Sequence, residues 1–270
     1  MLTDKRKLTD LTYCALDLET TGTNPVFHRI VEIGMVRFSL DRVHREYGSF
    51  VNPGMSMPEK VIPIHGITDD MVSSAPGIED LLHEIVDFMS GAVLVIQNPA
   101  FDLAFLYNVF RNRREDPSIL RSIDTVRLSK SAFPSFPNHK LNTLCDCLDI
   151  PVTHHRALSD ARACMEVFRR AVREYDQDGS WRMSDLGRVH GKYIVPKKFL
   201  EPMPDPGIFR KHRPGASVRI RYAGSDGIVS ERIIVPGQFF RYGKKKYVCA
   251  YCCLRKENRY FNLDSIIRIF

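Results

Sequence analysis

The first fifty residues alternate between short apolar runs and turn residues, which is the pattern of β-strands. Residues 13–18 form an apolar run that leads into the sequence DLETTGTNP, whose Gly, Asn and Pro mark a turn. The segments 29–38 and 46–51 are rich in residues that favour strands, and Gly34 interrupts the first of them. Because the connections between these segments are short, we predict three strands in an antiparallel meander.

From residue 78 the apolar positions recur with the period of an α-helix. Residues 78–90 place apolar side chains at positions 78, 81, 82, 85, 88 and 89, on one face of a helix. Residues 92–96 are an uninterrupted apolar run with the length of a buried strand, and helical spacing returns in three later segments, 101–110, 140–148 and 157–172. Strands followed by alternating helices and strands predict an α/β domain with a mixed sheet.

A segment rich in Pro, Gly and charge separates this domain from a second β-rich region. Residues 176–214 contain DQDG, EPMPDPG and HRPG, which predicts a linker with some local structure around 181–193. From about residue 216, five short β-rich runs alternate with turn sequences such as AGSDG and RYGKK. Five short strands in so small a region predict a small barrel or a strongly bent sheet.

Composition adds limits on the class of protein. The chain has 270 residues, of which 44% are hydrophobic and 26% charged, as is typical of globular proteins, and its length favours two domains. No apolar run approaches the roughly 20 residues that span a bilayer, so we expect no integral membrane protein and no membrane partner. The N-terminus lacks the apolar segment of a secretory signal, and the seven cysteines are an odd number. We therefore expect a cytoplasmic protein with reduced thiols.

The two parts of the chain differ in net charge. Residues 1–172 contain 19 Lys and Arg against 22 Asp and Glu, whereas residues 173–270 contain 20 against 10. The net charge is therefore −3 in the first part and +10 in the second. A strongly basic region favours a polyanionic partner, and nucleic acid is the first candidate. The alternative is a soluble protein with a basic tail domain.

Two acidic residues at the end of the first predicted strand are candidates for a metal site. Asp17 and Glu19 are two residues apart, so in a strand their side chains project from the same face. At 4 Å and an effective dielectric constant of about 20, two carboxylates repel each other by roughly 4 kcal/mol. A divalent cation removes this cost, and hard oxygen ligands favour Mg²⁺ or Mn²⁺. Alone, the D-x-E pattern is equally typical of two surface acids before a turn.

Further chemistry-bearing residues stand at element boundaries later in the chain. Asp102 follows a predicted buried strand and an Asn-Pro turn, which predicts a place at or near a helix N-terminus. Asp160 lies near the start of the last predicted helix of this domain. His155 precedes it by five residues, at or just before the helix start, from where its ring can swing over the carboxylates.

These residues lie in motifs that resemble the DEDD superfamily of 3′→5′ exonucleases, in its DEDDh branch with a catalytic histidine. Four stretches carry the resemblance in order: ALDLETTGTNP, VIPIHGITDDMV, VIQNPAFDLAFL and HRALSDA. The stretches IDTVRLSKSAFP and HKLNTLCDCLDIP are similar as well, so that the resemblance covers about residues 10–174. The chain is thus similar to the proofreading (epsilon) subunit of bacterial DNA polymerase III. It departs from the pattern at Gln97, where the second motif usually begins with a histidine.

The resemblance implies a ribonuclease-H-like fold, a mixed sheet flanked by helices, and two-metal hydrolysis of phosphodiester bonds. Two Mg²⁺ or Mn²⁺ ions would be held by Asp17, Glu19, Asp102 and Asp160. His155 would accept the proton of the attacking water, and the neighbouring His154 is the alternative base. Residues that the resemblance places beside the terminal nucleotide are Thr20, Thr21, Gly22, His65 and Phe101. Turn chemistry is the alternative role for the first three, and a place in the core for Phe101. Gln97 is not at a metal-ligand position, so we expect activity to survive this departure.

The basic C-terminal region alternates charged or aromatic residues with apolar ones. Residues 210–270 contain 14 Lys and Arg against four acids, and basic residues interleaved with tyrosines can contact phosphates and stack bases. A solvated basic face is the alternative. The segment resembles the WYL domain, a small Sm-like β-barrel of bacterial regulators, at Tyr222, Arg232, Arg255 and Arg259 among others, although Lys246 replaces the name-giving tryptophan. This resemblance implies binding of nucleic acid or a nucleotide-like ligand. The CxxC pair at 249–252 would point to opposite faces of a strand, which argues against zinc.

These observations predict an exonuclease domain at 10–174, a linker with local structure at 175–214 and a WYL-like β domain at 215–270. We expect a metal-dependent 3′→5′ exonuclease that acts on single-stranded or 3′-terminal nucleic acid, with DNA favoured. Proteins of DNA replication or repair are candidate partners, and the sequence leaves the oligomeric state open. The alternatives are an RNA exonuclease of the same superfamily and a regulator that senses a ligand through its WYL-like domain.

Overall fold

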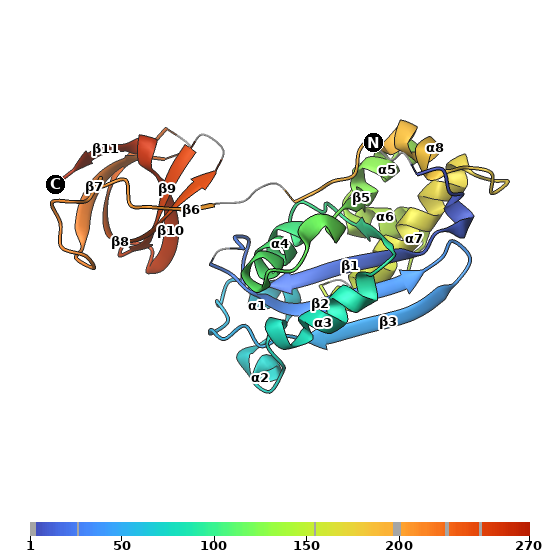
Figure 1. Cartoon of the computed structure of the whole chain (residues 1–270), viewed down its shortest axis with the longest axis horizontal. Helices are drawn as coiled ribbons and strands as arrows, with labels where there is room; N and C mark the ends of the chain where they lie inside the picture. Colours follow the sequence, from blue (N-terminus) through green and yellow to red (C-terminus); the bar gives the residue numbers. More distant parts are fainter. Residues whose placement is uncertain (1–3, 26, 154, 197–200, 225–226, 243–244) are drawn as a thin grey trace. The chain divides into compact units, whose positions relative to one another are not determined.

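The computed structural model of the chain describes residues 4–25, 27–153, 155–196, 201–224, 227–242 and 245–270. The chain divides into two compact units, Met1–Lys197 and Lys198–Phe270. Each unit is built around its own β-sheet (Figure 1). In the described parts of the chain, no helix is both long and apolar enough to cross a membrane.

A five-stranded mixed sheet in the order β3-β2-β1-β4-β5 forms the centre of the first unit. β1 pairs antiparallel with β2, and β2 with β3, whereas β4 is parallel to both β1 and β5. The strands are β1 Tyr13–Thr20, β2 Ile30–Phe38, β3 Val43–Phe50, β4 Val93–Ile96 and β5 Ser122–Asp124. The predicted meander and the mixed sheet are confirmed, and β5 is an addition that the sequence pattern did not indicate.

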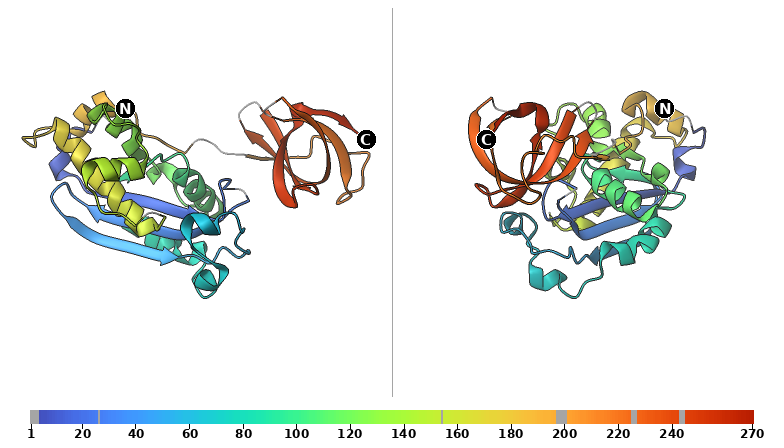
Figure 2. Two further views of the ribbon diagram at one scale, coloured as in Figure 1. Left: turned by 180° about the vertical axis from the view of Figure 1, so that it is seen from behind. Right: turned by 60° about the vertical axis from the view of Figure 1, so that its left-hand side comes forward.

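Helices cover both faces of this sheet (Figure 2). Successive residues of β1 point to opposite faces of the sheet and pack into two different apolar clusters. Tyr13 and Ala15 pack with α7, whereas Leu16 and Leu18 pack with α3 and α4. The four predicted helices are confirmed as α3, α4, α6 and α7. The helical segments are η1 Leu8–Asp10, α1 Ile62–His65, α2 Asp69–Val72, α3 Ile78–Met89, α4 Asp102–Arg113, η2 Pro117–Ile119, α5 Thr125–Ala132, α6 Leu141–Leu148, α7 Ala157–Tyr175 and α8 Met183–His190.

Four of these helices, α1, α2, α5 and α8, lie in segments where no helix was predicted. Asp124 caps α5, because its carboxylate accepts a hydrogen bond of 2.9 Å from the backbone N–H of Val126. Met183 and Leu186 of α8 are fully buried in the same apolar cluster as Leu128 of α5. Residues 183–190, within the part of the predicted linker where local structure was expected, thus contribute to the core of the first unit.

The second unit is an antiparallel sheet of six strands. The order is β10-β9-β8-β7-β11, and β6, from the segment before it, pairs with β8. Buried residues on one side of the sheet form its core, including Ile220, Ile234, Val248 and Phe261. The strands are β6 Glu201–Met203, β7 Val218–Ala223, β8 Val229–Tyr242, β9 Lys245–Cys252, β10 Glu257–Asn262 and β11 Ile266–Ile269.

Of the two forms that the sequence predicted, a small barrel or a strongly bent sheet, the structure shows the bent sheet and, over the residues it covers, no closed barrel. β10 and β11 are its two edges, and no ladder joins them in the residues that the structure describes. Only the 3₁₀ turn η3, Leu263–Ser265, separates the end of β10 from the start of β11, so one short connection bridges the two edges.

Candidate active site

The end of β1 presents two carboxylates to the face of the sheet that α7 covers. Asp17 and Glu19 lie on this face, and Gly34 of β2 is the direct partner of Asp17 in the ladder. A Cβ atom at Gly34 would lie 2.2 Å from the carbonyl carbon of Ala157, the first residue of α7. The glycine therefore allows the start of α7 to approach the sheet beside the two carboxylates.

Two further carboxylates reach the same place from helix starts. Asp102 is the first residue of α4 and is 3% exposed, and Asp160 lies in the first turn of α7 and is 7% exposed. Because β1 and β4 are parallel, the segments that follow them leave the sheet at the same edge. All four carboxylates line one cavity of about 460 Å³, together with Leu18, Gln97, Asn98, Phe101, Lys140, Leu141, Asn142 and His155.

Burial and mutual repulsion raise the pKa values of these carboxyl groups. Burial is the main cause for Glu19, whose pKa rises to about 8, and repulsion by acidic neighbours follows, that of Asp160 first. Burial also raises the pKa of Asp102 to about 7. The pKa of Asp17 lies well above its ordinary value because of burial and then of the charge on Asp102. A divalent cation would offset this repulsion, so the donor set fits a hard, oxygen-preferring metal.

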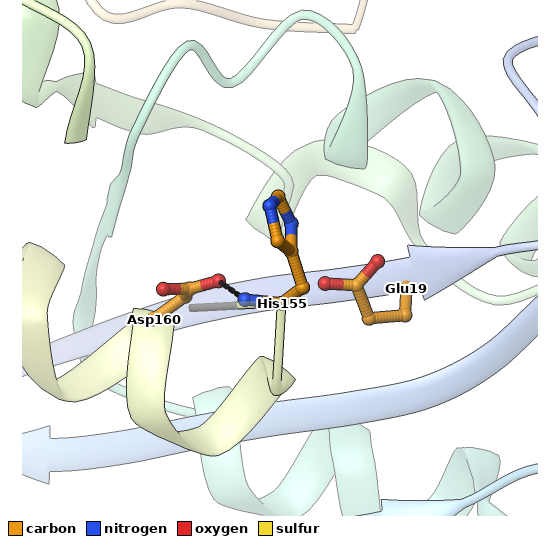
Figure 3. A group of neighbouring side chains, drawn as sticks. All are labelled: Glu19, His155 and Asp160. Atoms are coloured by element: carbon orange, nitrogen blue, oxygen red, sulfur yellow. Dashed lines mark hydrogen bonds between the residues drawn. The ribbon is translucent and has the colours of Figure 1, made fainter. Parts of the chain in front are cut away.

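His155 stands next to these carboxylates, just before α7. Its backbone has φ 61°, a left-handed conformation that is uncommon for a residue other than glycine. Its N–H donates a hydrogen bond of 2.9 Å to Oδ2 of Asp160 (Figure 3). A ring nitrogen of His155 and one carboxylate oxygen each of Glu19 and Asp160 all lie within 4.8 Å of one another. The alternative base, His154, lies outside the described residues.

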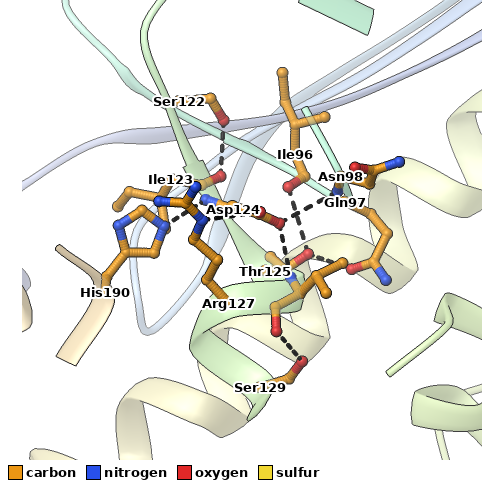
Figure 4. A network of polar contacts seen from close by, with 11 residues as sticks. Ile96, Gln97, Asn98, Ser122, Ile123, Asp124, Thr125, Arg127, Ser129 and His190 are labelled. Atoms are coloured by element: carbon orange, nitrogen blue, oxygen red, sulfur yellow. Dashed lines mark hydrogen bonds and ion pairs between the residues drawn. The ribbon is translucent and has the colours of Figure 1, made fainter. Parts of the chain in front are cut away.

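Gln97, which replaces the histidine usual in the second motif, links three segments at the edge of the cavity. Its Nε2 donates a hydrogen bond of 2.9 Å to the carbonyl oxygen of His139. Its Oε1 accepts a hydrogen bond from Oγ1 of Thr125 at the start of α5 (Figure 4). Gln97 thereby ties the end of β4 to α5 and to the segment before α6. Lys140, which lines the cavity, follows directly in that segment.

The five residues expected beside a terminal nucleotide have different places. Phe101 lines the cavity, and the centroid of its ring lies 5.1 Å from that of the buried Phe105. One part of the ring therefore faces the cavity and another packs against the core. The side chain of Thr20 donates a hydrogen bond of 2.8 Å to the carbonyl oxygen of Gly22. This contact fits the alternative role of the two residues in stabilising the turn.

Thr21 and His65 are not among the residues that line the cavity. Thr21 is fully buried and accepts a hydrogen bond of 3.0 Å from the N–H of Arg29. His65 is 6% exposed, and its Nδ1 accepts a hydrogen bond of 3.0 Å from the N–H of Ile67. Sequence reasoning did not single out Lys140 and Asn142 as lining residues, although both stand in the similar stretch HKLNTLCDCLDIP.

The second unit has a basic cavity of its own. Its volume is about 330 Å³, and the described residues that line it include three arginines, Arg232, Arg255 and Arg259, and no acidic side chain. Tyr222 and Tyr260 add aromatic surface to the wall. Among the described residues, Glu19, His155 and Asp160 lie close enough together to hold a metal ion, and no such group of His, Cys, Asp or Glu side chains lies in the second unit.

The chain matches two known families. The Exonuclease family, RNase_T, matches residues 14–168, and the WYL domain family matches residues 213–269. The first match spans more than half of the chain and contains the four carboxylates and His155.

Curated relatives share the first of these segments. The chain is 37% identical over 159 residues to the DNA polymerase III PolC-type of Oceanobacillus iheyensis, which covers 58% of this chain and 11% of that protein. It is 32% identical over 189 residues to the DNA polymerase III PolC-type of Bacillus subtilis, covering 69% of this chain and 13% of that protein. The chain thus spans only 11% and 13% of the length of these two relatives.

Solved structures support the fold of the first unit. The structure of Exonuclease X in complex with 5′ overhanging duplex DNA has a TM-score of 0.51 and 24% identity, covering 66% of this chain and 99% of that one. Exonuclease I of E. coli in complex with a dT13 oligonucleotide has a TM-score of 0.57 and 17% identity, covering 83% of this chain and 52% of that one. The chain therefore belongs to the exonuclease family, in its DEDDh branch of metal-dependent 3′→5′ hydrolases, and carries a WYL domain that follows the exonuclease domain in the sequence.

Proposed function

We propose that this chain removes nucleoside monophosphates one at a time from the 3′ end of nucleic acid, with single-stranded DNA or DNA 3′ ends favoured. The observation that carries the proposal is the convergence of four carboxylates and one histidine on a single open cavity. The names of the curated relatives, DNA polymerase III of the PolC type, support DNA as the substrate.

Each residue of the cavity has a role in this proposal. Asp17, Glu19, Asp102 and Asp160 would hold two divalent ions, Mg²⁺ or Mn²⁺. Bound metal supplies an activated water and stabilises charge on the leaving oxygen. His155 lies beside the carboxylates on an exposed segment, so its imidazole would act as the general base that accepts a proton from the attacking water. Phe101 is placed to contact a terminal base or sugar.

A time course on 5′-labelled strands tests this proposal. DNA and RNA of one sequence are incubated with Mg²⁺, Mn²⁺ or EDTA, and the products are separated by length. We expect a ladder that shortens from the 3′ end, forms faster on DNA and is absent in EDTA. Faster shortening of RNA would favour the RNA exonuclease alternative, and the absence of shortening with either metal would contradict the proposal.

The arginine-lined cavity of the second unit supports a nucleic-acid-binding role for the WYL domain. Cationic side chains that neutralise phosphates make binding depend on salt, with a slope near −0.7 per phosphate for single strands. Replacing Arg255 and Arg259 together by Gln should therefore reduce the slope by about 1.4. Arg268→Gln, an exposed arginine of the same sheet that does not line the cavity, is the matched control.

Fluorescence anisotropy measures this slope on a labelled strand of about 20 nucleotides, a length that exceeds the site size of a small domain. Ca²⁺ replaces Mg²⁺ to prevent cleavage. An unchanged slope in the double variant, combined with a cleavage rate that responds to added nucleotides, would favour the ligand-sensing alternative.

A further inference from the structure

A buried glutamate lies next to the cavity without lining it. Glu32 belongs to β2, is 6% exposed and is the direct cross-strand partner of Glu19. Cross-strand partners point to the same face of a sheet, so Glu32 also lies on the face that α7 covers. It is nevertheless absent from the lining of the cavity.

Glu32 is engaged instead with the two residues that follow His155. Its Oε1 accepts hydrogen bonds from Nε and Nη2 of Arg156, at 3.1 and 2.9 Å. Its Oε2 accepts a hydrogen bond of 3.0 Å from the backbone N–H of Ala157. A carboxylate that is bound by a guanidinium and by a helix N-terminal N–H is held as an acceptor for protein groups. These contacts argue against a role of Glu32 as a fifth metal ligand.

The same contacts hold His155 in an uncommon backbone conformation. Its φ of 61° is disfavoured for a side chain with a Cβ, so neighbouring contacts must maintain it. On one side, the N–H of His155 is bonded to Asp160, and on the other side Arg156 and Ala157 are bonded to Glu32. The guanidinium of Arg156 also lies 5.3 Å above the ring of Phe50, which fixes its direction further.

We propose that Glu32 is a positioning residue that holds the imidazole of His155 over the carboxylate cluster, an inference that rests on the proposed exonuclease function. Without its carboxylate, residues 156–157 lose their attachment to β2. The backbone of His155 then relaxes to commoner conformations, and the ring spends less time beside the attacking water. A loss of this kind lowers kcat and leaves the carboxylates that would hold metal in place.

The chain offers a matched control in a second ion pair between the sheet and α7. Arg162 donates to Glu46 of β3 at 2.7 and 2.6 Å, less than two helical turns beyond Arg156 and away from the cavity lining. Loss of this pair removes a contact between α7 and the sheet without touching the segment of His155. The comparison therefore shows whether any lost contact to α7 slows cleavage, and the His155→Ala background separates positioning from a structural effect of the buried Glu32.

The test compares Glu32→Ala, Glu32→Gln and Glu46→Ala with the unaltered chain, singly and in a His155→Ala background. We expect Glu32→Ala to lower kcat by about 10- to 100-fold, as loss of a supporting contact does, with KM and the metal concentration for half-maximal rate unchanged. Glu32→Gln, which retains an acceptor for the N–H of Ala157, should recover part of the rate. Glu46→Ala should stay within about twofold of the parent, because an exposed pair is worth little.

The double variants and a measurement without metal decide between positioning and general damage. In the His155→Ala background, removal of Glu32 should slow cleavage no further, because its effect passes through the imidazole. In metal-free protein, the NMR signal of the His155 ring should shift in Glu32→Ala and stay in place in Glu46→Ala.

Equal slowing by Glu32→Ala in both backgrounds, an unchanged kcat, or equal effects of Glu32→Ala and Glu46→Ala would overturn the inference. An inactive parent chain would instead contradict the proposed function, and the NMR comparison would then still test whether Glu32 holds the His155 segment.

Discussion

Glu19→Gln should make the metal-free protein more stable while weakening its response to metal. The pKa of Glu19 is raised to about 8, first by burial and then by acidic neighbours, from an ordinary value of 4.5. Folding therefore favours the protonated form of this group. Its contribution to stability is fully present below pH 4.5 and is lost as the pH rises toward 8. At pH 7 the folded chain must therefore take up a proton at Glu19 that the unfolded chain does not bind, which lowers the free energy of unfolding. Gln avoids this cost at nearly constant shape.

The size of the effect follows from the pKa. One pKa unit corresponds to 1.36 kcal/mol, so the 2.5 units between 4.5 and 7 give about 3 kcal/mol of destabilisation in the absence of metal. For a unit of this size, 1 kcal/mol shifts Tm by about 2–4 °C. The variant should therefore melt about 6–12 °C higher than the parent in EDTA at pH 7.

Divalent metal should remove most of this difference in stability. A ligand present at one hundred times its Kd stabilises a protein by about 2.7 kcal/mol, and the parent has one more carboxylate with which to bind it. We expect the Tm of the parent to rise with Mn²⁺ and that of Glu19→Gln to rise much less. Glu59→Gln, at an exposed residue outside the cavity, is the control. Equal melting temperatures in EDTA, or equal gains with Mn²⁺, would refute the electrostatic argument.

Three further predictions concern residues around the site. Gln97→Ala should raise KM several-fold and leave kcat within about threefold, because the side-chain amide supports the segment that carries Lys140. Loss of the two hydrogen bonds of this amide should also lower the free energy of unfolding by about 1–3 kcal/mol. Gly34→Ala should destabilise the chain by about 3 kcal/mol or more and abolish cleavage, because the new Cβ would lie 2.2 Å from the backbone of α7; urea unfolding and the cleavage assay check both effects. His190 has its pKa lowered to about 4 by burial and then by repulsion from Arg127, so its contribution to stability is complete above about pH 6.5 and is lost as the pH falls toward 4. Between pH 7 and 4.5 the parent should lose about 2–3 kcal/mol more than His190→Gln in urea unfolding, and parallel losses would contradict this.

The sequence predicted the central elements of the site because short-range patterns determine them. Asp17 and Glu19 share a strand face through their spacing of two, and Asp160 follows a clear helix start. The parallel pairing of β1 with β4 could not be derived from spacing, although it brings Asp102 to the same edge. The resemblance to the DEDDh family supplied this information, and the placement of the residues in one cavity agrees with it.

Other features depend on contacts between distant parts of the chain. Glu32 and Arg156 are 124 residues apart, and nothing in the sequence around either residue indicates the other. The three residues of β5 are too few for a periodic pattern, and α8 lies in a segment whose Pro and Gly content resembled a linker. The sequence left open a small barrel or a strongly bent sheet, and the bent sheet is observed, because alternation within strands identifies a sheet and does not show whether its edges pair.

Cleavage by Asp102→Asn tests the central claim most directly. The substitution keeps the shape of a side chain that is 3% exposed and removes the charge that metal would require. In single-turnover assays on a 5′-labelled DNA strand with Mg²⁺, the account predicts stepwise shortening from the 3′ end by the parent. For the variant it predicts a rate lower by at least about 10²-fold with unchanged melting behaviour or a higher Tm in EDTA. Cleavage by the folded variant at the rate of the parent would contradict the assignment of this cavity as the active site.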